Sequence, residues 1–229
     1  MKKRYTAALA AEFLGSMFLV TAAVASILLF TAVLEAEIGL AVFANAVMVA
    51  FVLCALIEIF SPVSGAHFNP VVTMIMLFER KIRAGKAVMY VTAQIAGGLA
   101  GTALGHLMFL DEIGSLFTVS DIARNDYVYI GEIVGTFVLV LALLMLVKAG
   151  SKKISFVVAF LVGGQVMATS STMFANPQVT IARMFTNSPA GIRPTDGLIF
   201  IVMQVSGALM AYAVYKLIFA KITYETEEK

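Results

Sequence analysis

The residues whose types and spacing most directly suggest chemistry are two Asn-Pro pairs, Asn69-Pro70 and Asn176-Pro177. Asn is favoured at the N-cap of a helix and Pro at the first helical position, so each pair predicts a helix start. The apolar runs that follow, 70–78 and 177–185, each span only about 13 Å at 1.5 Å per residue. Each pair therefore predicts a half-helix that enters a membrane and returns.

The side-chain amides of Asn69 and Asn176 can donate hydrogen bonds to a passing hydroxyl or water oxygen. If the two half-helices meet end to end, two positive dipole ends of about half a charge each point at one place. A cation there is repelled, whereas a neutral hydroxylated molecule is bound and passed on. The alternative interpretation is that both Asn residues serve only as helix caps.

The composition supports a membrane setting for this chemistry. The chain has 229 residues, of which 61% are hydrophobic and only 13% charged, and its mean hydropathy is +0.96. These values argue against a water-soluble enzyme, and a net charge of +2 argues against a nucleic-acid binder. With one cysteine, Cys54, and two histidines, the sequence predicts no disulfide, metal site or cofactor and no catalytic constellation.

Six apolar spans are long enough to cross a hydrocarbon layer of about 30 Å. They lie near 6–34, 38–60, 87–110, 127–148, 154–172 and 197–220. Because lipid offers the backbone no hydrogen-bonding partners, spans of this kind are helices. The sequence thus predicts an all-α integral membrane protein.

The basic residues predict how these spans are oriented. If the N-terminus lies inside, the outer segments hold only Arg124, Arg183 and Arg193 of the 16 Lys and Arg residues. Cytoplasmic loops are enriched in Lys and Arg, so this bias places both termini in the cytoplasm of a cell-membrane protein.

The two halves of the chain, about 5–110 and 127–220, contain matching motifs in the same order. The matched positions are Glu12 with Glu132, Asn69 with Asn176, and Gln94 with Gln204. Each half has three crossings, an odd number, so the second half must be inverted relative to the first. We therefore expect one domain over 1–229, with six transmembrane helices plus two re-entrant half-helices in an inverted 3+3 repeat. Such repeats are typical of transport proteins.

The motifs around the two Asn-Pro pairs resemble those of a known family. The runs at 64–71 (SGAHFNPV) and 174–179 (FANPQV), with the paired glutamates and glutamines, are similar to the aquaporin (major intrinsic protein) family. The run at 176–183 (NPQVTIAR) resembles a prokaryotic, aquaglyceroporin-like branch associated with arsenic handling. The resemblance implies the aquaporin-like fold and a homotetramer in the lipid bilayer with one pore per subunit.

The resemblance also implies a selectivity filter of four residues. By offset from the two Asn residues these are Val49, Gly164, Met173 and Val179. The resemblance implies that water-selective members carry an aromatic residue, a histidine, a small residue and an arginine at these positions. This chain departs at all four. A wide apolar filter favours glycerol, or a neutral metalloid hydroxide such as arsenous acid. Gln178 stands where the family usually has alanine, and its role stays open.

Further polar residues allow two interpretations each. Glu12 and Glu132 lie inside spans, where the resemblance implies that they support the re-entrant loops, with a proton relay as the alternative. His67 lines the inner pore or packs within its loop. Arg183, about 6 Å beyond the filter position, places a cation at the outer mouth or meets lipid phosphates. Glu58 lines the inner mouth or faces cytoplasmic water.

These observations predict a passive channel for water and small uncharged solutes. One alternative is an ion-coupled secondary transporter, because inverted repeats and broken helices occur there as well. Another is a non-conducting structural membrane protein whose pore is occluded.

Overall fold

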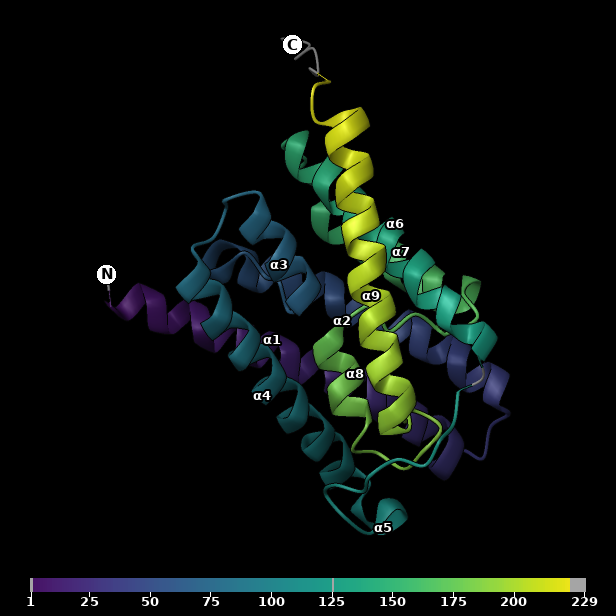
Figure 1. Ribbon diagram of the computed structural model, residues 1–229. Helices are drawn as coiled ribbons and strands as arrows, with labels where there is room; N and C mark the ends of the chain where they lie inside the picture. Colours follow the sequence, from purple (N-terminus) through teal and green to yellow (C-terminus); the bar gives the residue numbers. More distant parts are fainter. Residues whose placement is uncertain (1, 125, 223–229) are drawn as a thin grey trace.

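The computed structural model describes residues 2–124 and 126–222, and every regular element within these ranges is helical. In chain order the elements are α1 (Lys2–Leu28), η1 (Leu29–Val33), α2 (Ile38–Ser64), α3 (Pro70–Phe78), α4 (Ala84–Met108), α5 (Leu110–Ile113), η2 (Asp126–Val128), α6 (Tyr129–Lys148), α7 (Ile154–Ala168), α8 (Pro177–Arg183), α9 (Pro194–Val214) and η3 (Tyr215–Phe219). Figure 1 shows the long helices crossing one another, with α3 and α8 as short elements between them.

Five of the described helices are long and apolar enough to cross a membrane. They are Arg4–Val33, Ile38–Ser64, Ala84–Met108, Tyr129–Lys148 and Pro194–Phe219. A shorter apolar helix, α7, has 15 residues. The sequence predicted a span over 154–172, but α7 ends earlier because Thr169 has extended backbone angles (φ −109°, ψ 148°). At 1.5 Å per residue, α7 is only about 22 Å long.

The two short helices begin where the Asn-Pro pairs predicted. Helix α3 starts at Pro70 and has nine residues, and α8 starts at Pro177 and has seven. In both, the preceding Asn is the N-cap and Pro occupies the first turn. Helix α8 ends at Arg183, two residues before the predicted limit, because the chain turns there into the loop that leads to α9.

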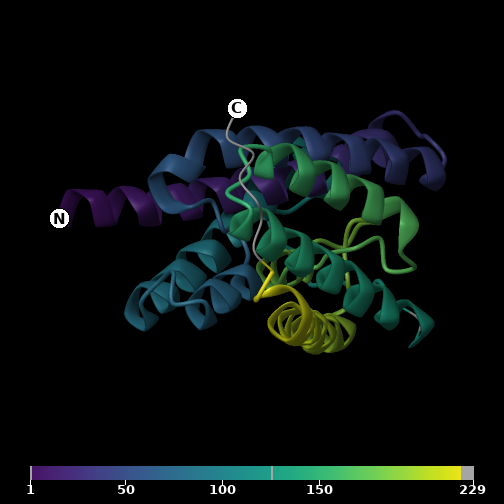
Figure 2. The same cartoon turned by 90° about the horizontal axis from the view of Figure 1, so that it is seen from above.

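The contacts within the first half of the chain have counterparts in the second. Helix α1 packs against α4 and α2, and α6 packs against α9 and α7. The halves meet where α2 packs on α7, α8 on α4 and α3 on α9. Figure 2 shows α1 and α2 running alongside each other, with α9 seen nearly end-on at the opposite side. Each short helix thus packs against both its own half and the other.

Glycine allows close helix contacts in both halves of the chain. A Cβ on Gly97 of α4 would lie 2.2 Å from the Phe13 carbonyl oxygen of α1. A Cβ on Gly207 of α9 would lie 2.5 Å from the Ile133 carbonyl oxygen of α6. Small residues let helix backbones approach closely in lipid, where packing replaces the hydrophobic effect as the driving force.

Replacing Gly97 by Val is expected to destabilise the protein by about 1–3 kcal/mol, the usual cost of overpacking. Thermal unfolding of the detergent-solubilised protein checks this through a lower melting temperature. Gly85→Val is the matched control in the same helix, because no heavy atom outside the local helix lies within 4 Å of a Cβ at Gly85. Equal melting temperatures for the two variants would contradict the assignment of Gly97 as a packing contact.

Candidate functional site

One cavity brings together most of the residues singled out in the sequence. Its walls come from α1, α2, α3, α6, α7 and α8 and from the loops that precede α3 and α8. Seven predicted site residues contribute to these walls: Val49, His67, Asn69, Met173, Asn176, Val179 and Arg183. The cavity therefore passes the point where the two short helices begin.

The two Asn side chains link the halves of the chain at that point. The Oδ1 atom of Asn69 accepts a hydrogen bond from the Val71 amide (3.0 Å), and its Nδ2 atom donates to the Ala175 carbonyl (2.8 Å). The contacts of Asn176 repeat this pattern: Oδ1 accepts from the Gln178 amide (3.2 Å), and Nδ2 donates to the Phe68 carbonyl (2.8 Å). A side-chain amide has two N–H donors, so each Asn keeps one beyond this cross-link.

The loops that lead to the two Asn residues have an irregular backbone. Ala66 and Phe68 have φ angles of 51° and 47°, and Thr172, Met173 and Ala175 have 59°, 37° and 45°. Left-handed angles are uncommon outside glycine and cost of order 1–3 kcal/mol each. Specific contacts must therefore hold both loops in place.

Two buried carboxylates make these contacts. Glu12 is fully buried and accepts hydrogen bonds from the amides of His67 (3.0 Å) and Phe68 (2.8 Å). Glu132, also fully buried, accepts from the amides of Phe174 and Ala175, both at 2.8 Å. Neither carboxylate is part of the cavity wall. Each glutamate therefore holds the loop of its own half of the chain: Glu12 holds the loop before α3, and Glu132 holds the loop before α8.

A glutamine and a threonine complete each carboxylate site. Gln94 donates through Nε2 to Glu12 (2.7 Å) and to the Thr73 hydroxyl (3.0 Å). Gln204 donates in the same way to Glu132 (2.6 Å) and Thr180 (2.8 Å). Neither threonine was among the residues predicted from the sequence, although each stands four residues after an Asn of the repeated pair, at 69 and 176. Comparison of the two halves at this offset would have found them.

The structure corrects the position predicted on α7. Gly164 is exposed on the side of α7 away from the cavity, and no heavy atom outside the local helix lies within 4 Å of a Cβ placed there. The residues of α7 that line the cavity recur every fourth position: Ile154, Val158, Val162 and Val166. The offset taken from the second Asn failed because it assumes a fixed loop length and helix rotation between α7 and α8.

Residues with open roles take definite positions. Gln178 is fully buried and donates from Nε2 to the Phe68 carbonyl (3.2 Å), so this carbonyl accepts from both Gln178 and Asn176. Glu58 lies on the exposed surface and accepts from the Ser155 hydroxyl. His67 contacts the Thr73 hydroxyl through Nδ1 (3.1 Å), in addition to lining the cavity.

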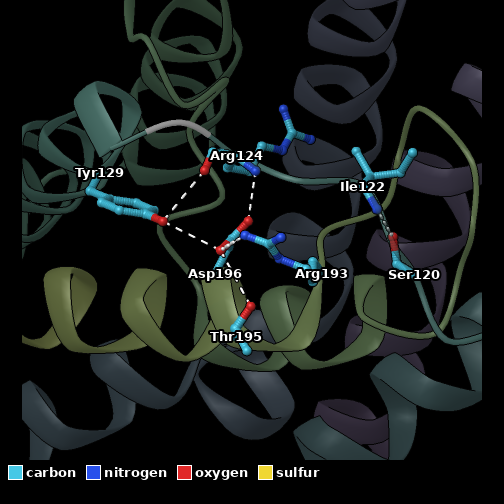
Figure 3. A network of polar contacts seen from close by, with 7 residues as sticks. All are labelled: Ser120, Ile122, Arg124, Tyr129, Arg193, Thr195 and Asp196. Carbon is cyan, nitrogen blue, oxygen red and sulfur yellow. Dashed lines mark hydrogen bonds and ion pairs between the residues drawn. The ribbon is translucent and has the colours of Figure 1, made fainter.

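A polar network links Arg124, in the segment that connects the two halves of the chain, to the start of α9 (Figure 3). Asp196 accepts from the Arg124 amide (2.7 Å) and from the Arg193 guanidinium (2.9 Å). The hydrogen bond to Asp196 raises the pKa of Arg193 above its ordinary value. The Tyr129 hydroxyl lies 3.4 Å from the same carboxylate. This network fixes the loops at the C-terminal end of α8, near Arg183.

Known proteins share these sequence features and this fold. The family described as Major intrinsic protein matches residues 1–175. Aquaglyceroporin AqpS of Rhizobium meliloti is 36% identical over 206 residues, which cover 90% of this chain and 87% of that protein. Aquaporin-1 of Mus musculus is 35% identical over 153 residues, covering 62% of this chain and 55% of that protein.

The fold comparison agrees with the sequence comparison. The X-ray structure of the aquaglyceroporin from Plasmodium falciparum superposes with a TM-score of 0.73 at 18% identity, covering 93% of this chain and 96% of that one. A cavity through the meeting point of two Asn-capped short helices is thus accompanied by a family match over most of the sequence. This chain belongs to the major intrinsic protein family, and it is a passive membrane channel rather than an enzyme.

Proposed function

We propose that this channel conducts water and small uncharged solutes such as glycerol. The observation that carries the proposal is the pair Asn69 and Asn176, whose amides cross-link the two loops and also form part of the cavity wall. The relatives support the same solutes, since one is named an aquaglyceroporin and another an aquaporin.

Asn69 and Asn176, with Pro70 and Pro177 behind them, act as polar guides in this proposal. The remaining N–H of each Asn donates to the oxygen of a passing water or hydroxyl group. The N-termini of α3 and α8 lie at the same point, so their dipoles disfavour a cation there. A neutral molecule exchanges its hydration for these donors, whereas a cation loses hydration and is repelled by the donors and the dipole ends.

The width of the path is set by apolar side chains. Val49, Met173 and Val179 line the cavity, and we add Val162, which lines it from α7 where Gly164 does not. An apolar wall makes few demands on the solute beyond its size, which suits glycerol and, we propose, a neutral metalloid hydroxide such as arsenous acid. His67 belongs to the inner pore in this proposal.

The proposal includes a membrane topology that follows the internal repeat. Six spans and two re-entrant half-helices, α3 and α8, form an inverted 3+3 repeat within one domain over 1–229. The halves run from about 5 to 110 and from about 127 to 220. Both termini lie in the cytoplasm, and the protein is a homotetramer in the cell membrane with one pore per subunit. The short α7 is the sixth span, extended across the layer by the chain that follows it.

Glu12 and Glu132 support the loops in this proposal and do not relay protons. Each carboxylate already accepts at least three hydrogen bonds from the protein, and neither lines the cavity. An ion-coupled transporter would need a carboxylate that reaches the solute path.

Val179→Arg is expected to lower glycerol permeability at least about tenfold while water still passes, because the added guanidinium narrows the cavity and demands acceptors from the solute. Stopped-flow light scattering on reconstituted vesicles measures both fluxes. Gly164→Ser, on the exposed side of α7, is the control and should leave both unchanged. Rapid water flux without glycerol entry in the unsubstituted protein would contradict the wide apolar filter. Absence of both fluxes would favour an occluded protein.

Glu132→Gln is expected to lower the melting temperature and the downhill flux together, because the loop loses charge-assisted hydrogen bonds worth about 1.5–3 kcal/mol each. Glu58→Gln is the matched control, since this carboxylate is exposed and its hydrogen-bond partner is Ser155 of α7 rather than an amide of either loop. The transporter alternative makes a different prediction. In that case Glu132→Gln would fold normally and lose only an ion-gradient dependence of uptake present in the unsubstituted protein.

A further inference from the structure

Two arginines lie against the same aromatic ring beside the cavity. The guanidinium carbon of Arg183 is 3.7 Å from the centroid of the Phe174 ring, and that of Arg124 is 5.6 Å from it. Phe174 precedes Asn176 by two residues, so both cations lie close to the second re-entrant loop. A guanidinium near an aromatic ring face is attracted by the ring quadrupole, which orients it along the wall.

Arg183 is buried and yet lines the cavity. The residue is only 6% exposed, and it belongs to the cavity wall. It is the last residue of α8, where the negative end of the helix dipole favours a cation. Its Nε atom donates to the Ala190 carbonyl, and its own carbonyl accepts from the Ile192 amide (3.2 Å). The side chain is thus held in one place rather than free to swing into lipid.

The loop that holds Arg183 is tightly packed. A Cβ on Gly191 would lie 2.0 Å from the Thr186 carbonyl oxygen, so only glycine fits there. The same Gly191 offers its carbonyl to the Arg124 guanidinium (3.1 Å). Arg124 is also fixed through its amide, which donates to Asp196. One loop therefore positions both arginines relative to Phe174.

Acidic groups nearby do not neutralise this pair directly. Glu132 accepts its hydrogen bonds from the Phe174 and Ala175 amides and from Gln204, and Asp196 forms its ion pair with Arg193. Within residues 4–124 and 127–222, neither Arg124 nor Arg183 forms an ion pair with a carboxylate. The cavity wall at Arg183 therefore carries a positive charge.

The apolar part of the wall lies one helical turn away from this charge. Val179 precedes Arg183 by four residues on α8, a rise of about 6 Å along the helix. Both side chains face the cavity, as expected for positions four residues apart. Val49 and Met173, which line the cavity from α2 and the second loop, are also uncharged.

We propose that this channel selects solutes by size and by charge at two successive levels. The apolar level at Val49, Met173 and Val179 limits the width of the solute. The second level, at Arg183, repels cations; Phe174 is the positioning residue whose ring holds its guanidinium against the wall, and Arg124 adds a second positive charge beside the same ring. The inference rests on the proposed channel function and deepens it, because it separates two tasks within one path. A charge in a narrow, poorly hydrated path acts more strongly than one in bulk water.

The test measures cation leak and glycerol flux on the same reconstituted full-length protein. Potassium and proton entry are followed with dyes trapped in the vesicles, and glycerol entry is followed by light scattering. In Arg183→Met the ratio of cation to glycerol permeability should rise about tenfold or more, because the repelling charge is gone. Arg183→Lys, which keeps the charge, should restore low leak. Arg124→Gln leaves Arg183 in place and should raise the leak by a smaller factor.

Val49→Phe supplies the converse measurement. The added ring enters the apolar level, so glycerol flux relative to water should fall while cation leak stays low. An unchanged cation-to-glycerol ratio in folded Arg183→Met, with normal flux in the unsubstituted protein, would overturn the two-level arrangement and leave the channel function intact. A cation leak in Val49→Phe equal to that of Arg183→Met would overturn it as well. Absence of water and glycerol flux through folded, unsubstituted protein would overturn the proposed function and this inference with it.

Discussion

The architecture depends on two carboxylates in an apolar environment, where the free-energy cost of burying a carboxylate is high. Glu12 and Glu132 are fully buried in an apolar helical bundle. Each accepts hydrogen bonds from the backbone amides of one loop, and these amides would otherwise lack partners. Irregular backbone at membrane depth is tolerated only where its polar groups find partners in protein or water. The glutamates satisfy the amide side of each loop, and so the loops can keep left-handed angles at non-glycine residues.

Because the glutamates hold the loops on the side away from the cavity, the side that faces the cavity can form a polar path. The Asn69 amide reaches the Ala175 carbonyl and the Asn176 amide reaches the Phe68 carbonyl, so each half of the chain completes the capping site of the other. This reciprocity explains why the functional centre lies at the interface of the two halves rather than within either one. It also explains why α3 and α8 each pack against a helix of the opposite half.

The two halves are not chemically equivalent, and the differences concentrate beside the second loop. Gln178 adds a second donor to the Phe68 carbonyl, whereas the Ala175 carbonyl accepts from Asn69. The connector between the halves contributes Arg124, and the end of α8 contributes Arg183, both against Phe174. A repeated scaffold thus carries an asymmetric set of charges at one end of the cavity.

Local features of the sequence determined the class of protein, the main helices and the starts of both short helices. Hydropathy and the Asn-Pro signals act over a few residues, so they do not depend on how the chain packs. The tertiary structure decided which side chains face the cavity: it turned Gly164 outward, brought Val162 inward, recruited Thr73 and Thr180, and set two distant arginines around Phe174. Helix rotation and contacts between residues far apart in the chain set these positions, and neither is encoded in the spacing of any single motif.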